Sequence, residues 1–258
     1  MADQLSIDLW FFGLDAPAGG LAGWERLLDA GEQARQARFK FAHDQKRFLI
    51  CRMRMRRILG RYVRADPATL VFGEVGRGKP VLGGVHAGAA LAFNLSHTDG
   101  LACLAVVRSG RHTLGVDIER VRAIDDEFAA FALTPREVAR VRRASRGAAF
   151  DRAFFHHWTA KEAFLKGPGH GLWQSLRTFD VAPEPDGPAC ARDGAIAFHE
   201  AGLPRIDDPG QRAAGWRLFT FEVGREFIGA VAVDAGAACD IRFRARHLAP
   251  ESLPVRPR

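Results

Sequence analysis

No apolar run in the 258-residue chain approaches the ~20 residues that a helix needs to span a bilayer. The first residues also lack the basic stretch and apolar segment of a secretion signal. We therefore expect a cytoplasmic protein with no membrane partner. Disordered chains, collagens and coiled coils are excluded by the composition, since 47% of the residues are hydrophobic and 26% are charged.

Closely spaced cysteines and abundant lysines are missing as well. The four cysteines lie about fifty or more residues apart, which fits neither a disulfide framework nor a zinc site and favours a reducing compartment. Only five of the 37 basic residues are lysines, so an ammonium that remains is expected for its compactness or its proton chemistry. These lysines are Lys40, Lys46, Lys79, Lys161 and Lys166.

Positive charge is concentrated in the first half of the chain. Residues 1–114 hold 16 basic and 10 acidic groups, whereas residues 115–258 hold 21 and 20. Between Arg35 and Arg64, 11 basic groups accompany one acid, Asp44. This density predicts an anionic partner, which can be a phosphorylated ligand, an acidic protein or a nucleic acid. A solvated cationic helix face is the alternative interpretation.

Hydrophobic periodicity predicts the same order of elements twice. In the first half we expect a strand, a helix, a second helix with Asp44 as its N-cap, and a strand hairpin that turns at residues 98–100. These elements are the strand Gln4–Leu14, the helices Ala22–Phe39 and Asp44–Val63, and the strands Leu91–Ser96 and Leu101–Arg108.

The second half is predicted to repeat this plan. Its elements are the strand His112–Glu119, the helical stretches Asp126–Ala144 and Asp151–Lys166, and the hairpin WRLFTFEV–GR–EFIGAVAV. We therefore expect an α+β fold with duplicated β-α-α-β-hairpin halves. The N-terminal half spans 1–112, the C-terminal half spans 113–247, and a flexible Pro-rich tail follows at 248–258. Residues 183–188 and 204–210 are expected to form loops.

Two other patterns fail as sites. GEVGRGKP fits a phosphate-binding loop until Pro80, which replaces the hydroxyl residue that binds Mg²⁺, and no helix follows, so only Lys79 remains a binding candidate. His156 and His157 are adjacent and point about 100° apart on a helix, whereas metal-binding pairs lie three or four residues apart.

The segment GVDIE places two carboxylates on one face of a predicted strand. Asp117 and Glu119 alternate with Val116 and Ile118, so they stand roughly 7 Å apart along the backbone. Their combined field favours a cation between them. The alternative interpretation is an exposed strand with its polar residues outward.

The segment WTAKEAFLK, at the end of a predicted helix, carries the second pattern. Trp158, Glu162 and Lys166 follow one another at four-residue spacing and share a face. A surface ion pair worth only ~0.3–0.5 kcal/mol is the alternative interpretation. If this helix packs beside the strand, Asp117, Glu119 and Glu162 provide three hard oxygen ligands suited to Mg²⁺. Lys166 could then neutralise a phosphate leaving group, which indicates phosphoryl-group chemistry on a polyanionic substrate.

Together, GVDIE and WTAKEAFLK, about forty residues apart, resemble the paired signatures of the 4′-phosphopantetheinyl transferases. The length and doubled plan resemble the Sfp-type branch, whose members are pseudo-twofold monomers. GKP, FNLSH and GHGL are supporting matches, and the resemblance covers roughly residues 35–180. It implies that family's fold and the transfer of the 4′-phosphopantetheine arm of coenzyme A to a serine of an apo acyl or peptidyl carrier protein.

By position, the resemblance implies that Asp117, Glu119 and Glu162 hold Mg²⁺ on the pyrophosphate of coenzyme A. Glu162, or a metal-bound water, accepts the serine proton, the serine attacks the β-phosphate, and Lys166 assists the departure of 3′,5′-ADP. The catalytic set is thus Glu162, Lys166 and Asp117. The residues expected to bind coenzyme A, at its 3′-phosphate and adenine end or within the motif, are Arg47, Lys79, Ser96, His97 and Lys161.

One part of the implied nucleotide site departs from the family pattern. Arg35 fits the extra basic residues expected before the first-half helix, but Glu32 stands where another cation is expected. Arg52, Arg56 and Arg61 are expected either to face the nucleotide or to dock an acidic carrier protein.

A basic nucleic-acid-binding module that uses the Arg52–Arg64 helix is the main alternative. That helix has apolar residues such as Ile50, Ile58 and Leu59 to bury, and no recognised nucleic-acid motif accompanies it. The alternative also leaves WTAKEAFLK unexplained, so we expect no nucleic-acid partner. A degenerate, non-catalytic family member is a second alternative, which the intact carboxylate set opposes.

Overall fold

The computed structural model describes residues 4–15, 21, 23–76, 78–168, 176–183, 189–194, 196–206, 215–236 and 239–248. The first half contains β1 (Gln4–Gly13), α1 (Ala30–Ala37), α2 (Ala42–Val63), β2 (Phe72–Val75), β3 (Lys79–Leu82), β4 (Ala92–Thr98) and β5 (Leu101–Val107). The second half contains β6 (Leu114–Arg120), α3 (Asp126–Ala132), α4 (Pro135–Val141), α5 (Ala148–Lys166), β7 (Phe179–Ala182), β8 (Ala191–Asp193), β9 (Ile196–Ile206), β10 (Trp216–Val223), β11 (Phe227–Asp234) and β12 (Asp240–His247).

Two sheets repeat one arrangement of three strands. The first has the order β12-β1-β5-β4, and the second has the order β6-β11-β10-β9-β7, with β8 paired to β9. In each half the first strand pairs antiparallel with the second strand of the later hairpin, as β1 does with β5 and β6 does with β11. The hairpins themselves, β4–β5 and β10–β11, are also equivalent. The predicted α+β fold with duplicated halves is therefore confirmed.

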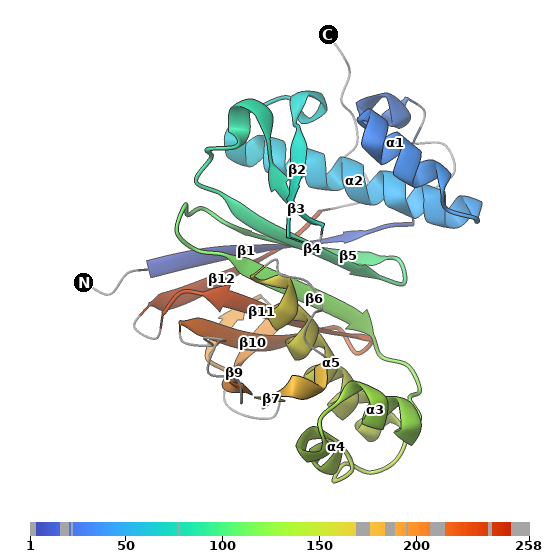
Figure 1. Ribbon diagram of the computed structural model, residues 1–258, viewed down its shortest axis with the longest axis vertical. Coiled ribbons are helices and arrows are strands. Elements are labelled where there is room, and N and C mark those ends of the chain that lie inside the picture. The colour runs from blue at the N-terminus through green and yellow to red at the C-terminus, as the bar shows by residue number, and fades with distance from the viewer. Residues whose placement is uncertain are drawn as a thin grey trace.

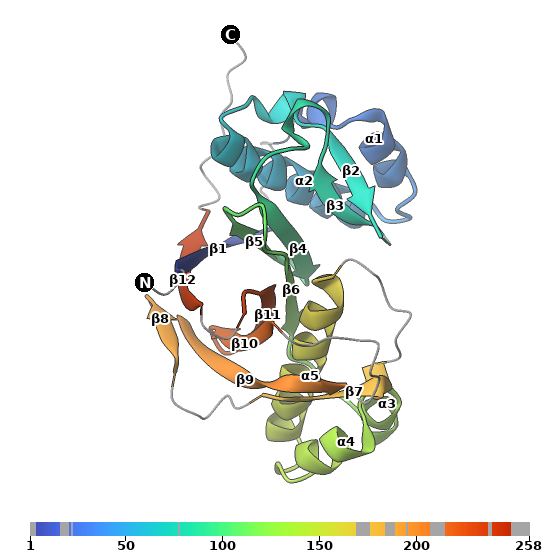
Figure 2. The same ribbon diagram turned by 60° about the vertical axis from the view of Figure 1, so that its left-hand side comes forward.

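The two sheets face each other, and each carries one long helix on its outer side (Figure 1, Figure 2). Alternate residues of the strands point into the shared core, as Ile7 of β1 and Val116 of β6 do. The other face of the first sheet packs on α2 through residues such as Ile58, and that of the second packs on α5 through residues such as Ala163. This layering places α5 directly against β6. Within the described residues, no helix is long and apolar enough to cross a membrane.

The last strand returns to the first sheet. β12 pairs in parallel with β1, from Gln4 opposite Asp240 to Phe11 opposite His247. Leu248 then donates its N–H to the carbonyl of Phe11 at 2.9 Å and is buried, so it is not part of a flexible tail. The remainder of the predicted tail lies outside the described residues. So do most residues of the two predicted loops, although 204–206 belong to β9.

Capping interactions divide the helix predicted over Ala22–Phe39. A 3₁₀ turn occupies Trp24–Leu27, and α1 begins only at Ala30. Asp29 and Glu32 form a capping box there, in which each side chain accepts the backbone N–H of the other residue. The chain therefore turns before α1 and does not continue as one helix.

Two other predicted helix boundaries are wrong for related reasons. The stretch Asp126–Ala144 is divided into α3 and α4, because Thr134 caps a new helix that has Pro135 in its first turn. α2 begins at Ala42, so Asp44 lies within its first turn and is not the N-cap. An acidic side chain there still interacts favourably with the helix dipole.

Gly115, the first residue of GVDIE, allows α5 to approach β6. A Cβ atom at this position would lie 2.1 Å from the carbonyl oxygen of Ala163 and 2.5 Å from the nitrogen of Gly167. Both contacts are with backbone atoms, which cannot rotate away. The glycine therefore sets the distance between the strand and the helix that carry the two sequence motifs.

We expect Gly115→Ala to lower the free energy of unfolding by about 2–3 kcal/mol, because overpacking against rigid backbone strains the fold. Urea denaturation measures this loss. Gly88→Ala is the matched control, since a Cβ there meets no atom within 4 Å. Equal stability of the two variants would contradict the close approach.

Candidate active site

The two halves meet where β4 lies along the edge strand β6 (Figure 2). These strands belong to different sheets, so side chains and not a backbone ladder connect them. Alternate residues of β4 point toward β6, as strand geometry requires. The bonds link Asn94 Oδ1 to the N–H of Val116 (2.8 Å), Ser96 Oγ to Asp117 Oδ1 (2.7 Å) and Thr98 Oγ1 to Glu119 Oε2 (3.0 Å).

We call the line of side-chain contacts between β4 and β6 the seam. Helix α5 brings the second motif, WTAKEAFLK, to it. The Lys166 ammonium lies 2.6 Å from Asp117 Oδ1 and 3.2 Å from Ser96 Oγ. The other carboxylate oxygen of Asp117 is buried and has no hydrogen-bond partner among the described residues. Glu162 lies one turn before Lys166 on the same face, half-buried. The structure therefore brings Asp117, Glu162 and Lys166 together, and it adds Ser96, which the resemblance placed at the nucleotide end of the site.

The carboxylates of this cluster disfavour one another's charge. Burial, followed by the charge of Asp117, raises the pKa of Glu162 to about 6. Burial and Asp117 also raise the pKa of Glu119, although its bonds to Thr98 and Arg122 oppose the shift. The charge of Glu119 also raises the pKa of Glu162, so each of the three carboxylates lies in the electric field of the others. Such a site attracts a cation.

The carboxylates of Asp117, Glu119 and Glu162 are suitable ligands for a divalent ion, although their oxygens are not arranged around one point in the structure. Among the described residues, no three histidine, cysteine or acidic side chains form a ready metal cage. The Lys166 ammonium lies on Asp117 and supplies positive charge there. The unpartnered oxygen of Asp117, together with two carboxylates of raised pKa, forms the all-oxygen set that Mg²⁺ prefers.

A cavity of about 480 Å³ opens beside the cluster, between α1, α2 and the β2–β3 hairpin. Aromatic, basic and acidic side chains all line it. Among these lining residues are Phe39, Phe48, Phe72, Arg35, Arg52 and His97. Arg35 lies over the Phe48 ring at 6.0 Å. The cavity thus offers flat apolar surfaces together with cations.

His97 connects the cavity to the acidic cluster. Desolvation, then the cations Lys166, Arg35 and Arg47, hold the pKa of His97 below its ordinary value. Arg47 contacts Asp15 through two hydrogen bonds, at 2.8 and 3.1 Å, on the same side of the molecule. Cations therefore surround His97, and an anion bound among them would lower their mutual repulsion.

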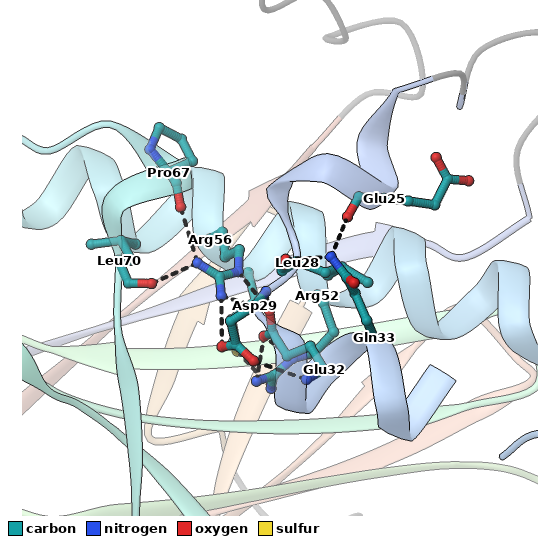
Figure 3. A network of polar contacts seen from close by, with 10 residues as sticks. Glu25, Leu28, Asp29, Glu32, Gln33, Arg52, Arg56, Pro67 and Leu70 are labelled. Atoms are coloured by element: carbon teal, nitrogen blue, oxygen red, sulfur yellow. Dashed lines mark hydrogen bonds and ion pairs between the residues drawn. The ribbon is translucent and has the colours of Figure 1, made fainter. Parts of the chain in front are cut away.

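Glu32 stands where the family pattern predicts a further cation for the nucleotide. In the structure it is the centre of a buried network of hydrogen bonds (Figure 3). Its carboxylate accepts bonds from Arg52 at 2.6 Å and from Arg56 at 2.5 and 3.0 Å. Arg56 also bonds Asp29 and the carbonyls of Pro67 and Leu70, so all five of its donors are used. The acid therefore neutralises arginines that hold α1 on α2.

Comparison with known proteins identifies the family to which the sequence is similar. The family described as the 4′-phosphopantetheinyl transferase superfamily matches residues 113–215, and the family described as 4′-phosphopantetheinyl transferase, N-terminal, matches residues 21–109. The chain is 36% identical over 185 residues to 4′-phosphopantetheinyl transferase HetI of Nostoc sp., which covers 71% of this chain and 76% of that protein.

Two further relatives carry the same description. A phosphopantetheinyl transferase of Thraustochytrium sp. is 28% identical over 247 residues, covering 87% of this chain and 80% of that protein. The 4′-phosphopantetheinyl transferase Sfp of Bacillus subtilis is 27% identical over 150 residues, covering 58% and 64%. The chain belongs to the 4′-phosphopantetheinyl transferase family. The resemblance of its motifs is thereby confirmed, and with it the class of enzyme.

Two lysines that the family motifs place at coenzyme A point elsewhere. Lys161 is 0% exposed and pairs at 2.8 Å with Glu137, which is equally buried. Its other bonds go to the carbonyls of Leu176 and Phe179. Lys79 likewise donates to three protein oxygens. Because an ammonium has three donors, neither lysine has one left for a ligand in this arrangement, which does not favour the predicted contacts with coenzyme A.

The arginines of α2 do not form the basic surface that the sequence predicts. Arg54 and Arg56 are 2% and 1% exposed, and Arg52 is bound to Glu32, so these side chains form no basic face. Arg56 is buried with every donor used, and Arg52 lines the cavity while bound to Glu32, so neither supports a docking surface on α2. The nucleic-acid alternative is likewise unsupported by these two residues. Arg61 remains exposed. Ser96 lies on Asp117 and Lys166 rather than in the cavity.

Sequence reasoning missed Asn94 and Thr98, although one signal identifies them. They flank Ser96 at two-residue spacing in FNLSHT, and a polar residue at every second position of a strand predicts a polar contact along that face. The GHGL match, in contrast, lies outside the described residues.

We expect Glu162→Gln to have a higher free energy of unfolding than the original protein at pH 7.5 without metal. The difference should be about 2 kcal/mol, the value that corresponds to the pKa shift of Glu162. The folded pKa of about 6 lies above the ordinary value of 4.5, so the stability of the original protein falls as pH rises between them. Urea denaturation at pH 4.5 and 7.5 in EDTA measures this, and the advantage of the variant should vanish at the lower pH. Glu226→Gln, at an exposed position, is the control. An advantage independent of pH would contradict the repulsion.

Proposed function

We propose that the chain transfers the 4′-phosphopantetheine arm of coenzyme A to a serine of an apo acyl or peptidyl carrier protein, depends on Mg²⁺ and releases 3′,5′-ADP. The observation that carries the proposal is the seam itself. An acidic cluster with a partly exposed lysine, Lys166, stands beside a cavity lined by aromatic, basic and acidic side chains. This suits a ligand with a flat base, a phosphate and a pyrophosphate.

Coenzyme A would lie across the seam. The cavity would take its adenine against Phe39, Phe48 or Phe72, and the cations around His97, namely Arg35 and Arg47, would bind the 3′-phosphate. The pyrophosphate would then reach the acidic cluster. Asp117, Glu119 and Glu162 would hold Mg²⁺, which when bound supplies charge neutralisation at the phosphoryl oxygens.

Glu162 and Lys166 have complementary roles in the proposed transfer. With a pKa of about 6, Glu162 is ionised at neutral pH and basic enough to accept the proton of an incoming serine hydroxyl. Lys166 retains side-chain exposure of 31% and can neutralise the phosphate of the leaving nucleotide. Because both halves of one chain contribute to the site, we expect it to act as a monomer in the cytoplasm.

An exposed aromatic surface adjoins the helix of Glu162. Phe131 of α3 is 77% exposed, and its neighbour Phe128 lies 5.8 Å from the Trp158 ring, one turn before Glu162. An apolar side chain of the carrier protein beside its serine could rest there. This surface replaces Arg52 and Arg56 in the expected docking.

Mass spectrometry tests the function directly. An apo carrier protein incubated with the enzyme, coenzyme A and Mg²⁺ should gain one phosphopantetheine, and Glu162→Gln should slow this gain at least roughly 100-fold because the base is lost. Glu226→Gln should act like the original protein. No gain with carriers of fatty-acid, polyketide and nonribosomal peptide pathways would refute the proposal, and near-normal turnover by Glu162→Gln would remove it as the base.

Arg47 tests the position of the nucleotide. Arg47→Ala should raise KM for coenzyme A roughly tenfold and leave KM for dephospho-coenzyme A within about twofold, because only the former carries the 3′-phosphate. Asp15→Asn releases Arg47 from its partner and should not raise KM. Equal effects of Arg47→Ala on both substrates would refute the assignment.

A further inference from the structure

The side chain of Lys79 extends from the first half to the end of the catalytic helix of the second. Its ammonium donates to Thr113 Oγ1 at 3.0 Å, to the Leu114 carbonyl at 2.8 Å and to the Gly167 carbonyl at 2.6 Å. Thr113 Oγ1 donates to the Gly167 carbonyl as well, at 3.0 Å. Three elements therefore meet at one ammonium: the hairpin strand β3, the start of β6 and the end of α5.

This position is the C-terminus of α5. Gly167 follows the last residue of α5, where carbonyl groups have no intrahelical donor and the helix dipole is negative. A cation from another element satisfies both requirements. Lys166, the last residue of the helix, is the one that contacts Asp117.

The same segment of hairpin lines the nucleotide cavity. Gly78 and Pro80 lie on the cavity wall, and Lys79 stands between them. Because successive residues of a strand point to opposite faces, Lys79 is directed away from the wall that its neighbours form. The backbone of residues 78–80 thus connects the cavity wall to the end of α5 through the Lys79 side chain.

Lys79 also lacks the counter-charge that buried cations usually have. Among the described residues it forms no ion pair, and all three of its acceptors are neutral oxygens. Burial lowers its pKa to about 8. Lys161, in contrast, is paired with Glu137. Neutral carbonyl and hydroxyl oxygens are the acceptors at a helix end, so the contacts of Lys79 are those of a cap and not of an ion pair.

We infer that Lys79 is a positioning residue that caps α5 across the interface between the halves and fixes Lys166 and Glu162 relative to the nucleotide cavity. It acts through the Gly167 carbonyl and does not touch the substrate. The inference rests on the proposed function for its effect on catalysis, but the cap itself can be measured without any substrate.

Lys79→Met keeps the length of the side chain and removes its donors. We expect kcat to fall roughly 10- to 100-fold, because small displacements of reacting groups have effects of this order. The Kd values of coenzyme A and dephospho-coenzyme A should both stay within about threefold, since no phosphate contact is lost. Arg244→Met, at an exposed position of β12, removes one positive charge elsewhere and should change neither.

Hydrogen exchange followed by mass spectrometry reads the cap directly. In the substrate-free protein, Lys79→Met should speed exchange of the amides at 163–167 at least roughly tenfold, while amides in the middle of α5 keep their protection. Thr113→Val removes one of the three oxygens that accept from Lys79 and is a milder change than Lys79→Met. It should speed exchange at 163–167 by a smaller factor. Its effect on kcat should be largely lost in the Lys79→Met background, because both side chains serve one contact.

Three results would overturn the inference. One is unchanged exchange at 163–167 in both variants, and another is faster exchange with normal kcat. The third is a Kd increase of roughly tenfold or more for coenzyme A but not for dephospho-coenzyme A, which would make Lys79 a phosphate ligand. Absence of transfer by the original protein would instead refute the proposed function, and the exchange result would still decide the cap.

Discussion

The site depends on a row of three hydrogen bonds between strands that share no backbone pairing. Asn94, Ser96 and Thr98 of β4 reach the backbone or carboxylates of β6, and each lies two residues from the next. The two strands belong to different sheets, so side chains fix their spacing at this point. The N–H of Ile118 also donates to Ser96 Oγ at 3.4 Å, and the Lys166 ammonium contacts both Ser96 and Asp117. The acidic cluster therefore exists only when both halves are in place, and α5 approaches it only because Gly115 leaves room.

Many cations in this arginine-rich chain serve the fold. Arg56 uses five donors on neighbouring carboxylates and carbonyls, and Lys161 uses three on Glu137 and two carbonyls. Buried cations with every donor satisfied are stable in the interior, whereas unpaired ones are not. The positive charge that remains for a ligand is therefore smaller than the composition indicates. Around His97 it consists of Arg35, Arg47 and Lys166.

The three carboxylates of the seam reduce stability as long as no cation joins them. Their burial and mutual repulsion raise the pKa of Glu162 and Glu119, which measures how unfavourable their charged forms are. Structural needs do not explain this cost, because only Asp117 and Glu119 accept bonds that hold the seam. The proposed site for a divalent ion and a polyanionic ligand would explain it.

The sequence by itself determined the elements and the order in which they repeat. Alternation and helical periodicity are local properties, so they predicted the strands, the long helices and the shared faces of Asp117 with Glu119 and of Glu162 with Lys166. The motif spacing also identified the family. Helix ends were less predictable. Asp29 and Thr134 each cap the start of a new helix at a point where periodicity predicts that one helix continues.

Only the tertiary structure decided which charged side chains are free. Lys79, Lys161 and Arg56 carry the same charge in the sequence as Lys166 and Arg47. Oxygens distant in the sequence use every donor of the first three, whereas within the described residues the hydrogen bonds of Lys166 and Arg47 use only two donors each. Position along the chain does not encode which carbonyl groups will face an ammonium, because those groups come from other elements. The packing of two halves against each other supplies them, and it thereby separates the cations that hold the fold from those left to bind.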